Sequence, residues 1–106
     1  MLIENTIIIS HRLIKGGYRL LTLKSSKIAP RVLPGQFVHL RVPSPADAVL
    51  RRPFSVFRTQ AGRLAILYKT VGKGTQAMES LHTGDEVNLV GPVSYTHLTL
   101  PTNREV

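Results

Sequence analysis

Hydrophobic residues occur along this chain in short runs that glycine and proline interrupt, a pattern typical of β-strands joined by turns. The alternation is clearest at 37–42, where Val38, Leu40 and Val42 share one face of an extended chain. Turn residues separate the runs: Pro34-Gly35 precedes this strand, and Gly16-Gly17 lies between the first two. The pattern predicts six strands, at 7–14, 18–23, 37–42, 54–58, 64–69 and 86–90.

One segment has the residue types of a helix. Residues 76–81 are good helix formers, Thr75 is a suitable N-cap and Gly84 lies just past the end, so a short α-helix is expected at about 75–82. A helix this short cannot form the crossover between two parallel strands, which argues against a Rossmann unit. The strands and the single helix together indicate an all-β antiparallel barrel or sandwich.

Length and charge narrow the functional classes. The 106 residues suffice for one domain, and the absence of cysteine excludes a disulfide framework, a thiolate zinc site and an iron–sulfur cluster held by this chain. A formal net charge of +8 favours an anionic partner: nucleic acid, an anionic membrane, or a phosphorylated ligand or cofactor. The sequence shows neither a signal peptide nor a membrane-spanning run, so we expect a cytoplasmic protein with no membrane partner.

The first of two anion-recognising segments is 51–55. Arg51 and Arg52 stand just before a predicted strand, Pro53 fixes its beginning, and Phe54 and Ser55 point to opposite faces. Arginine suits phosphate oxygens, and Ser55 can bond a heteroaromatic edge while Phe54 packs nearby. The alternative is an exposed basic loop followed by a phenylalanine of the core.

The second segment runs from Tyr68 through a glycine-rich loop to the start of the predicted helix. Gly72 and Gly74 let the backbone approach a phosphate closely, Lys73 adds a charge, and Thr75 can bond the ligand or cap the helix. The spacing does not match a P-loop, and an ordinary flexible loop is the alternative. If the strands between the two segments pair as a hairpin, one diphosphate can contact both.

Other polar residues carry weaker signals. The four histidines show no metal-ligand spacing, His39 fits an ordinary strand position, and Asp85-Glu86 follows a turn glycine. A nucleic-acid-binding barrel of the OB type also suits short strands and positive charge, and a structural basic domain is a third alternative. Only 6% of the residues are aromatic, and no predicted strand interleaves rings with basic residues, so no nucleic-acid partner is expected.

Five short motifs follow one another along the chain: Pro34-Gly35-Gln36-Phe37-Val38, Arg52-Pro53-Phe54-Ser55, Gly72-Lys73-Gly74-Thr75, Gly84-Asp85 and Gly91-Pro92. In this order they resemble the FAD-binding barrel of the ferredoxin-reductase family, over residues 1–92. Within this family, the residues of the motifs most resemble those of the branch formed by electron-transfer subunits of dihydroorotate dehydrogenase. FAD modules of sulfide dehydrogenase or ferredoxin–NADP reductase subunits are the alternatives. The resemblance implies a six-stranded antiparallel Greek-key barrel that carries FAD.

The resemblance implies nine cofactor-binding residues: Arg52, Pro53, Phe54, Ser55, Leu67, Tyr68, Lys69, Gly74 and Thr75. Arg52, Gly74 and Thr75 would contact the diphosphate. Phe54 would flank the flavin ring, and Ser55 would bond near its reactive nitrogen. Residues 67–69 would line the flavin and the ribityl chain.

The sequence departs from the family after Gly91-Pro92. The family continues into an NAD-binding domain and a cysteine cluster that holds a [2Fe–2S] centre, which passes electrons to the dihydroorotate dehydrogenase catalytic subunit of pyrimidine biosynthesis. Here residues 93–106 form a polar, Thr-rich tail that does not follow the family pattern. We therefore expect an oxidoreductase component that carries FAD but does not turn over alone, with the NAD and [2Fe–2S] sites in the missing part.

Overall fold

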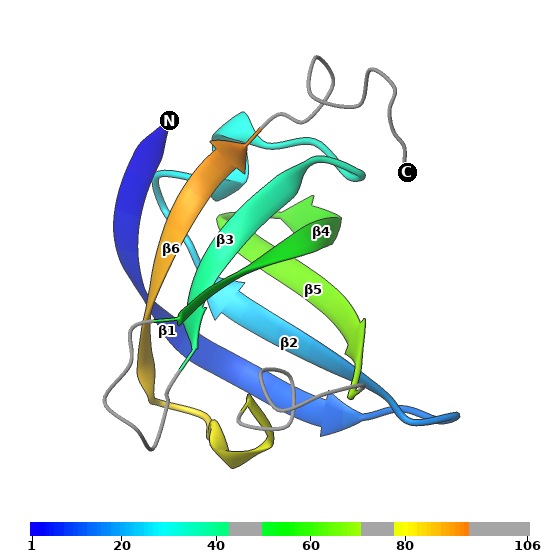
Figure 1. Ribbon diagram of the computed structural model, residues 1–106. Coiled ribbons are helices and arrows are strands. Elements are labelled where there is room, and N and C mark those ends of the chain that lie inside the picture. The colour runs from blue at the N-terminus through cyan, green and yellow to red at the C-terminus, as the bar shows by residue number, and fades with distance from the viewer. Residues whose placement is uncertain (43–49, 71–77, 94–106) are drawn as a thin grey trace.

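The computed structural model describes residues 1–42, 50–70 and 78–93. Its strands form one closed antiparallel barrel in the order β1-β2-β5-β4-β3-β6 (Figure 1). The strands are β1 (Leu2–Leu13), β2 (Tyr18–Lys24), β3 (Phe37–Val42), β4 (Leu50–Gln60), β5 (Arg63–Lys69) and β6 (Glu86–Val93). Because β2 pairs with β5 and β3 with β6, the connections are those of a Greek key, and the predicted six-stranded barrel is confirmed.

Side chains from alternating strand positions fill the barrel. Val38 and Leu40 point inward, as their alternation predicts, and both are fully buried. Each such aliphatic side chain contributes about 1.5–3 kcal/mol by leaving water. The other large side chains that are fully enclosed come mostly from the strands: Ile8, Leu21, Leu23, Ile28, Val56, Leu64, Ile66, Met78 and Leu89.

The first strand begins earlier than its hydrophobic pattern predicts. β1 starts at Leu2, and its first half pairs with β6 while its second half pairs with β2. The inward-facing residues of the first half include Glu4 and Thr6, which are buried but polar. The prediction of a strand beginning at residue 7 was wrong because these two positions break the alternation of hydrophobic residues.

The α-helix predicted at about 75–82 is absent from the described part of that segment. Residues 75–77 lie outside the described residues, and Met78–Ser80 form a 3₁₀ turn, η2, in which Leu81 N–H donates to Met78 O at 3.0 Å. The chain then turns at once, because Asp85 accepts a bond from His82 N–H at 2.8 Å. This turn leaves no length for an α-helical turn after Ser80. A second 3₁₀ turn, η1, spans Ala29–Arg31, and none of the helices in residues 1–42, 50–70 and 78–93 has the length and hydrophobicity to cross a membrane.

Glu4 fixes the chain that leaves β2. Its carboxylate accepts hydrogen bonds from Ser25 Oγ at 2.7 Å and from the backbone amides of Ser26, Lys27 and Ile28 at 2.9, 3.0 and 3.1 Å. Burial raises the pKa of this carboxyl, but the hydrogen bonds from Ser25, Lys27, Ile28 and Ser26 outweigh burial and hold the pKa below 4.5. The ionised carboxylate therefore joins β1 to the connection between β2 and η1.

Replacing Glu4 by Gln should lower the free energy of unfolding by about 1–3 kcal/mol at neutral pH, because charged hydrogen bonds are lost. The folded-state pKa of Glu4 is lowered, so this contribution is present above pH 4.5 and is lost as the pH falls through the folded value. Urea unfolding at several pH values checks both points. The exposed Glu86→Gln variant is the control, and equal midpoints for Glu4→Gln and the wild type at neutral pH would contradict the assignment.

The β4–β5 hairpin closes through a two-residue loop, Ala61-Gly62. The two φ angles are +50° and +77°, between the paired residues Gln60 and Arg63. Two positive φ angles are the pattern of a type I′ turn, whose twist matches that of the flanking strands. Glycine adopts this conformation freely, whereas alanine is strained in it.

Substituting Ala61→Asn should therefore raise the free energy of unfolding, by about 0.5–1 kcal/mol, because Asn tolerates the left-handed conformation and Asn-Gly is the preferred type I′ pair. Ala61→Val should lower it, since a β-branched residue is poorly tolerated at positive φ. Thermal unfolding of the two variants beside the wild type gives the comparison. A lower melting temperature for Ala61→Asn than for Ala61→Val would show that the turn has a different geometry.

Candidate functional site

Strands β4 and β5 pair over only part of their length. Their register runs from Val56↔Ile66 to Gln60↔Arg63. Before Val56, β4 pairs only with β3. After Ile66, β5 pairs only with β2. In Figure 1 the beginning of β4 and the end of β5 accordingly lie on different sides of the barrel. We call the two diverging segments, residues 52–55 and 67–69, the β4–β5 seam.

The backbone of β4 presents one side of its chain to the seam. Val56 N–H donates to Gln36 O at 2.7 Å, toward β3. Because amide directions alternate along a strand, the N–H of Phe54 also points toward β3, while the nitrogens of Pro53 and Ser55 point toward the seam. Proline has no N–H to lose there, which explains its presence inside a strand. The prediction that Arg52 and Pro53 precede the strand was therefore wrong: β4 begins at Leu50.

The structure describes seven of the nine predicted cofactor-binding residues: Arg52, Pro53, Phe54 and Ser55 on β4, and Leu67, Tyr68 and Lys69 on β5. Phe54 is buried and Ser55 exposed, so these two point to opposite faces as predicted. The rings of Phe54 and Tyr68 meet edge to face with centroids 5.8 Å apart, which joins the two sides of the seam on the inside of the barrel. Gly74 and Thr75 lie outside the described residues.

The seam also carries two positively charged side chains, and a hydroxyl group without a hydrogen-bond partner follows it. Arg52 and Lys69 are exposed on its two sides, and Lys69 Nζ lies 5.7 Å from the ring centroid of Tyr18. Thr70 follows Lys69, and its Oγ1 is buried without a hydrogen-bond partner in the part of the chain that is described. Buried hydroxyls nearly always have a partner, so this atom is an exception among the described residues. Thr70 lies in the second anion-recognising segment, but its burial depends on the tertiary fold and is not visible in the sequence.

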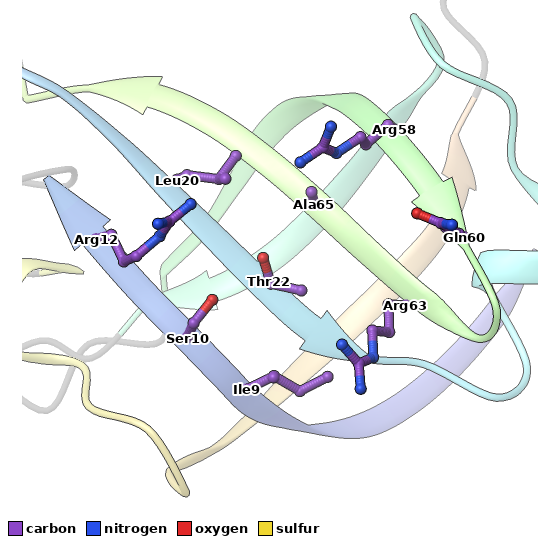
Figure 2. Close-up of a pocket in the computed structure, with 9 residues that line it drawn as sticks. All are labelled: Ile9, Ser10, Arg12, Leu20, Thr22, Arg58, Gln60, Arg63 and Ala65. Carbon is purple, nitrogen blue, oxygen red and sulfur yellow. The ribbon is translucent and has the colours of Figure 1, made fainter. Parts of the chain in front are cut away.

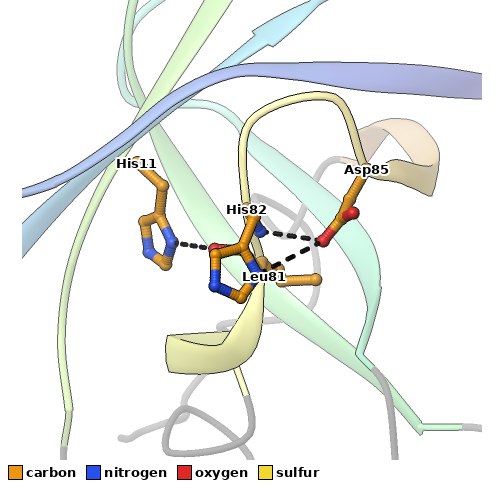
Figure 3. A network of polar contacts seen from close by, with 4 residues as sticks. All are labelled: His11, Leu81, His82 and Asp85. Atoms are coloured by element: carbon orange, nitrogen blue, oxygen red, sulfur yellow. Dashed lines mark hydrogen bonds and ion pairs between the residues drawn. The ribbon is translucent and has the colours of Figure 1, made fainter.

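Tyr68 is held by His11, a residue that the sequence pattern did not single out. Tyr68 OH and His11 Nε2 are hydrogen-bonded at 2.7 Å. On the other side of the ring, His11 Nδ1 donates to Leu81 O at 3.0 Å (Figure 3). Because a carbonyl oxygen only accepts, His11 Nδ1 carries the hydrogen of the bond to Leu81. The His11 and Tyr68 rings also stack, with centroids 5.9 Å apart. The partners of His11 are 57 and 70 positions away, so no local signal could have identified its role.

Burial raises the pKa of Tyr68 to about 12, while the positive charge of Arg19 lowers it and Glu79 raises it further. The phenol therefore remains protonated in its hydrogen bond with His11. Asp85 acts as a turn residue, as predicted, and His82 Nδ1 lies 4.0 Å from its carboxylate (Figure 3). Within the described ranges, no group of three or more acidic or histidine side chains is placed to hold a metal ion. With cations, an amide and a buried hydroxyl beside aromatic rings, the seam can bind an anionic aromatic ligand.

The raised pKa gives a test of the Tyr68 assignment. Its neutral form is favoured in the folded state, so its contribution to stability is present below pH 10 and is lost as the pH rises toward 12. Tyrosinate absorbance followed against pH should show one late component, with a midpoint at about pH 12. Tyr68→Phe should remove that component, whereas Tyr18→Phe, at an exposed position, should leave it. Loss of the late component in Tyr18→Phe would contradict the assignment.

Comparison with protein families gives one match, which covers most of the chain. The family model described as the oxidoreductase FAD-binding domain matches residues 3–97. Among curated proteins, the electron transfer subunit of dihydroorotate dehydrogenase B (NAD(+)) from Geobacillus thermodenitrificans is 36% identical over 94 residues, 87% of this chain and 37% of that protein. The protein of the same name from Desulforamulus reducens is 43% identical over 76 residues, 70% of this chain and 29% of that protein. The chain thus spans about a third of the length of these relatives.

Solved structures share the barrel. An NADH-dependent reduced ferredoxin-NADP oxidoreductase is 27% identical with a TM-score of 0.73, over 82% of this chain and 33% of that one. A siderophore-interacting protein from Acinetobacter baumannii has a TM-score of 0.75 at 17% identity, over 89% of this chain and 42% of that one. The second likeness shows the fold alone.

Proposed function

Because the chain belongs to the family of oxidoreductase FAD-binding domains, we propose that it binds FAD along the β4–β5 seam and carries it for electron transfer. The observation that carries the proposal is the parting of β4 from β5 between residues 52–55 and 67–69. The family resemblance assigns these two segments to FAD. In the barrel they are not paired with each other, and no other strand lies between them. When bound, the flavin supplies the redox chemistry, and the protein supplies binding and orientation.

The residues of the seam fit the chemical groups of FAD. A flavin edge carries hydrogen-bond acceptors and a donor, and Ser55 offers it a hydroxyl and an amide that points toward the seam. The diphosphate is anionic, and the exposed guanidinium of Arg52 can form a bidentate contact with it. The buried Thr70 Oγ1, which has no partner in the described residues, can donate to the same ligand.

The apolar residues of the seam orient the ring. Phe54 and Tyr68 form an aromatic wall on the side of the core, and the half-buried Leu67 covers the neighbouring position of β5. His11 is a positioning residue in this arrangement. It does not touch the ligand, but its hydrogen bond with the Tyr68 hydroxyl fixes the orientation of the Tyr68 ring. By resemblance to the family, Gly74 and Thr75 would also contact the diphosphate.

The identity of 36–43% to the curated relatives favours one electron-transfer role within the family. We propose that the chain is the FAD-binding part of an electron transfer subunit that serves a dihydroorotate dehydrogenase catalytic subunit in the cytoplasm. The NAD and [2Fe–2S] sites would then belong to the two-thirds of such a subunit that this chain does not match, so the chain alone would not turn over. Residues 1–92 would form the FAD-binding unit; the family model extends the match to residue 97, so residues 98–106 lie outside it.

A ferredoxin–NADP reductase subunit is the second candidate. It is supported by the 27% identity and TM-score of 0.73 to the NADH-dependent reduced ferredoxin-NADP oxidoreductase. The curated relatives are more similar in sequence, so the first candidate is favoured. Measuring which electron acceptor a longer protein with this barrel reduces, orotate through a catalytic subunit or ferredoxin, would distinguish the two.

FAD binding by the 106-residue chain tests the common part of both candidates. Titrating FAD with the protein should quench flavin fluorescence and shift the visible spectrum. Arg52→Gln should weaken binding by about tenfold or more, because a charge-assisted hydrogen bond is worth about 1.5–3 kcal/mol.

The matched control is Arg31→Gln, which removes one positive charge from the exposed residue at the end of η1. It should change the dissociation constant by less than about twofold, since distant exposed charges are screened. A flavin spectrum that stays that of free FAD would overturn the proposal. Equal losses in Arg52→Gln and Arg31→Gln would remove Arg52 from the site.

A further inference from the structure

Two β-bulges interrupt the barrel in strands β1 and β4. In β1 the register shifts between Ile8 and Ser10, and Ile8 points into the core. Strict alternation would turn Ser10 inward as well, but the extra residue Ile9 places Ser10 opposite Thr22. Thr22 lies between the inward-facing Leu21 and Leu23, so both Thr22 and Ser10 face outward.

The bulge in β4 has the same effect. The register shifts between Val56, which is buried, and Arg58, which pairs with Ala65. The extra residue Phe57 turns Arg58 from the inside of the barrel to the outside. Bulges are often found beside binding sites, where they redirect a side chain.

The residues that follow the two bulges, Ser10 and Arg58, lie in the same row of residues across the sheet. Ser10 pairs with Thr22, Thr22 with Ala65, and Ala65 with Arg58, so one row crosses β1, β2, β5 and β4. Three of its four side chains are small. Small side chains in the middle of the sheet surface leave a depression, with two hydroxyls in its floor.

Arginines surround this depression. Arg12 and Arg58 extend from the two outer strands over the middle ones, and Arg63 borders the floor from β5 (Figure 2). The cleft encloses about 190 Å³, and none of the described residues that line it is acidic. The ion pairs among the described residues leave all three arginines without a carboxylate partner. Three guanidinium groups held around one small cleft repel one another, and an anion in the cleft would relieve that repulsion.

We propose that this cleft, formed by Ser10, Thr22, Ala65, Arg12, Arg58 and Arg63, binds the phosphoryl group of a small anionic ligand. Guanidinium groups offer phosphate oxygens paired N–H donors, and serine and threonine hydroxyls add single ones. The volume suits a phosphoryl group and is below the roughly 300 Å³ at which drug-sized pockets begin.

The cleft adjoins the β4–β5 seam but lies over a different part of the strands. Ala65 in its floor is two residues from Leu67 of the seam on the same face of β5, whereas Arg63 and Lys69 stand at opposite ends of that strand, about 20 Å apart. The proposal goes beyond FAD binding and does not depend on it. A ligand here would lie on the outer face of the barrel, over the paired halves of β4 and β5, whereas the seam lies where those strands part.

Pyrophosphate is the probe, added to the isotope-labelled 106-residue chain and followed by two-dimensional NMR. The amides of Ser10, Thr22 and Ala65 should shift and saturate together, with and without excess FAD. Arg58→Gln and Arg12→Gln should each weaken binding by about tenfold or more. ADP serves as a second arm: binding equal to that of pyrophosphate identifies a phosphoryl group as the whole determinant, and tighter binding at the same amides identifies a nucleotide.

The matched control is Arg41→Gln, which removes an arginine from β3. Arg41 pairs with Arg51, seven residues along β4 from Arg58, so its loss should change the affinity by less than about twofold. The proposal is overturned if millimolar pyrophosphate shifts no cleft amide, or if Arg41→Gln weakens binding as much as Arg58→Gln. If the chain fails to bind FAD while the cleft amides still saturate, the proposed function fails and the cleft proposal stands.

Discussion

The end of β4–β5 pairing at Val56↔Ile66 is the constraint on which the candidate site depends. Elsewhere in a closed barrel each strand has its hydrogen-bonding groups occupied by two neighbours, so the sheet has no free edge. Where β4 leaves β5, the backbone groups on that edge of β4 have no strand partner and are left for water or a ligand. Pro53 removes one amide from that side, and Ser55 retains one.

The core stabilises this opening from within. Phe54 and Tyr68 meet edge to face across it, and His11 holds the Tyr68 hydroxyl from β1. His11 is itself fixed by the carbonyl of Leu81, which follows η2. The side chains that close the inside of the barrel therefore also determine the shape of the surface where a flavin would lie. A change at His11 would reach the ligand through the Tyr68 ring.

Much of the fold could be predicted from sequence because it depends on local signals. The alternation at Val38 and Leu40 and the turn glycine Gly35, at a φ of +92°, gave the position of β3 directly. The early part of β1 could not be predicted, since the buried partners of Glu4 are 21 to 24 residues away. Packing explains why a glycine stands at position 91 of the Gly91-Pro92 motif. A Cβ there would lie 2.8 Å from Val38 Cγ1 on the neighbouring strand.

The candidate site divides in the same way. Arg52, Phe54 and Ser55 were identified because arginine, an aromatic ring and a hydroxyl in one short segment suit a phosphorylated aromatic ligand. His11, Thr70 and the arginines of the outer cleft were not identified. Their neighbours are set by strand register, and single-residue bulges at Ile9 and Phe57 reverse the face that alternation assigns to Ser10 and Arg58. A bulge leaves no composition signal, so its effect becomes visible only in the paired strands.

A crystal structure of the chain grown with FAD would show whether the flavin lies at the β4–β5 seam. We expect flavin density along the seam, with the ring edge within hydrogen-bond distance of Ser55 and the diphosphate beside Arg52. Flavin density over another face of the barrel, with residues 52–55 and 67–69 uncontacted, would contradict this placement.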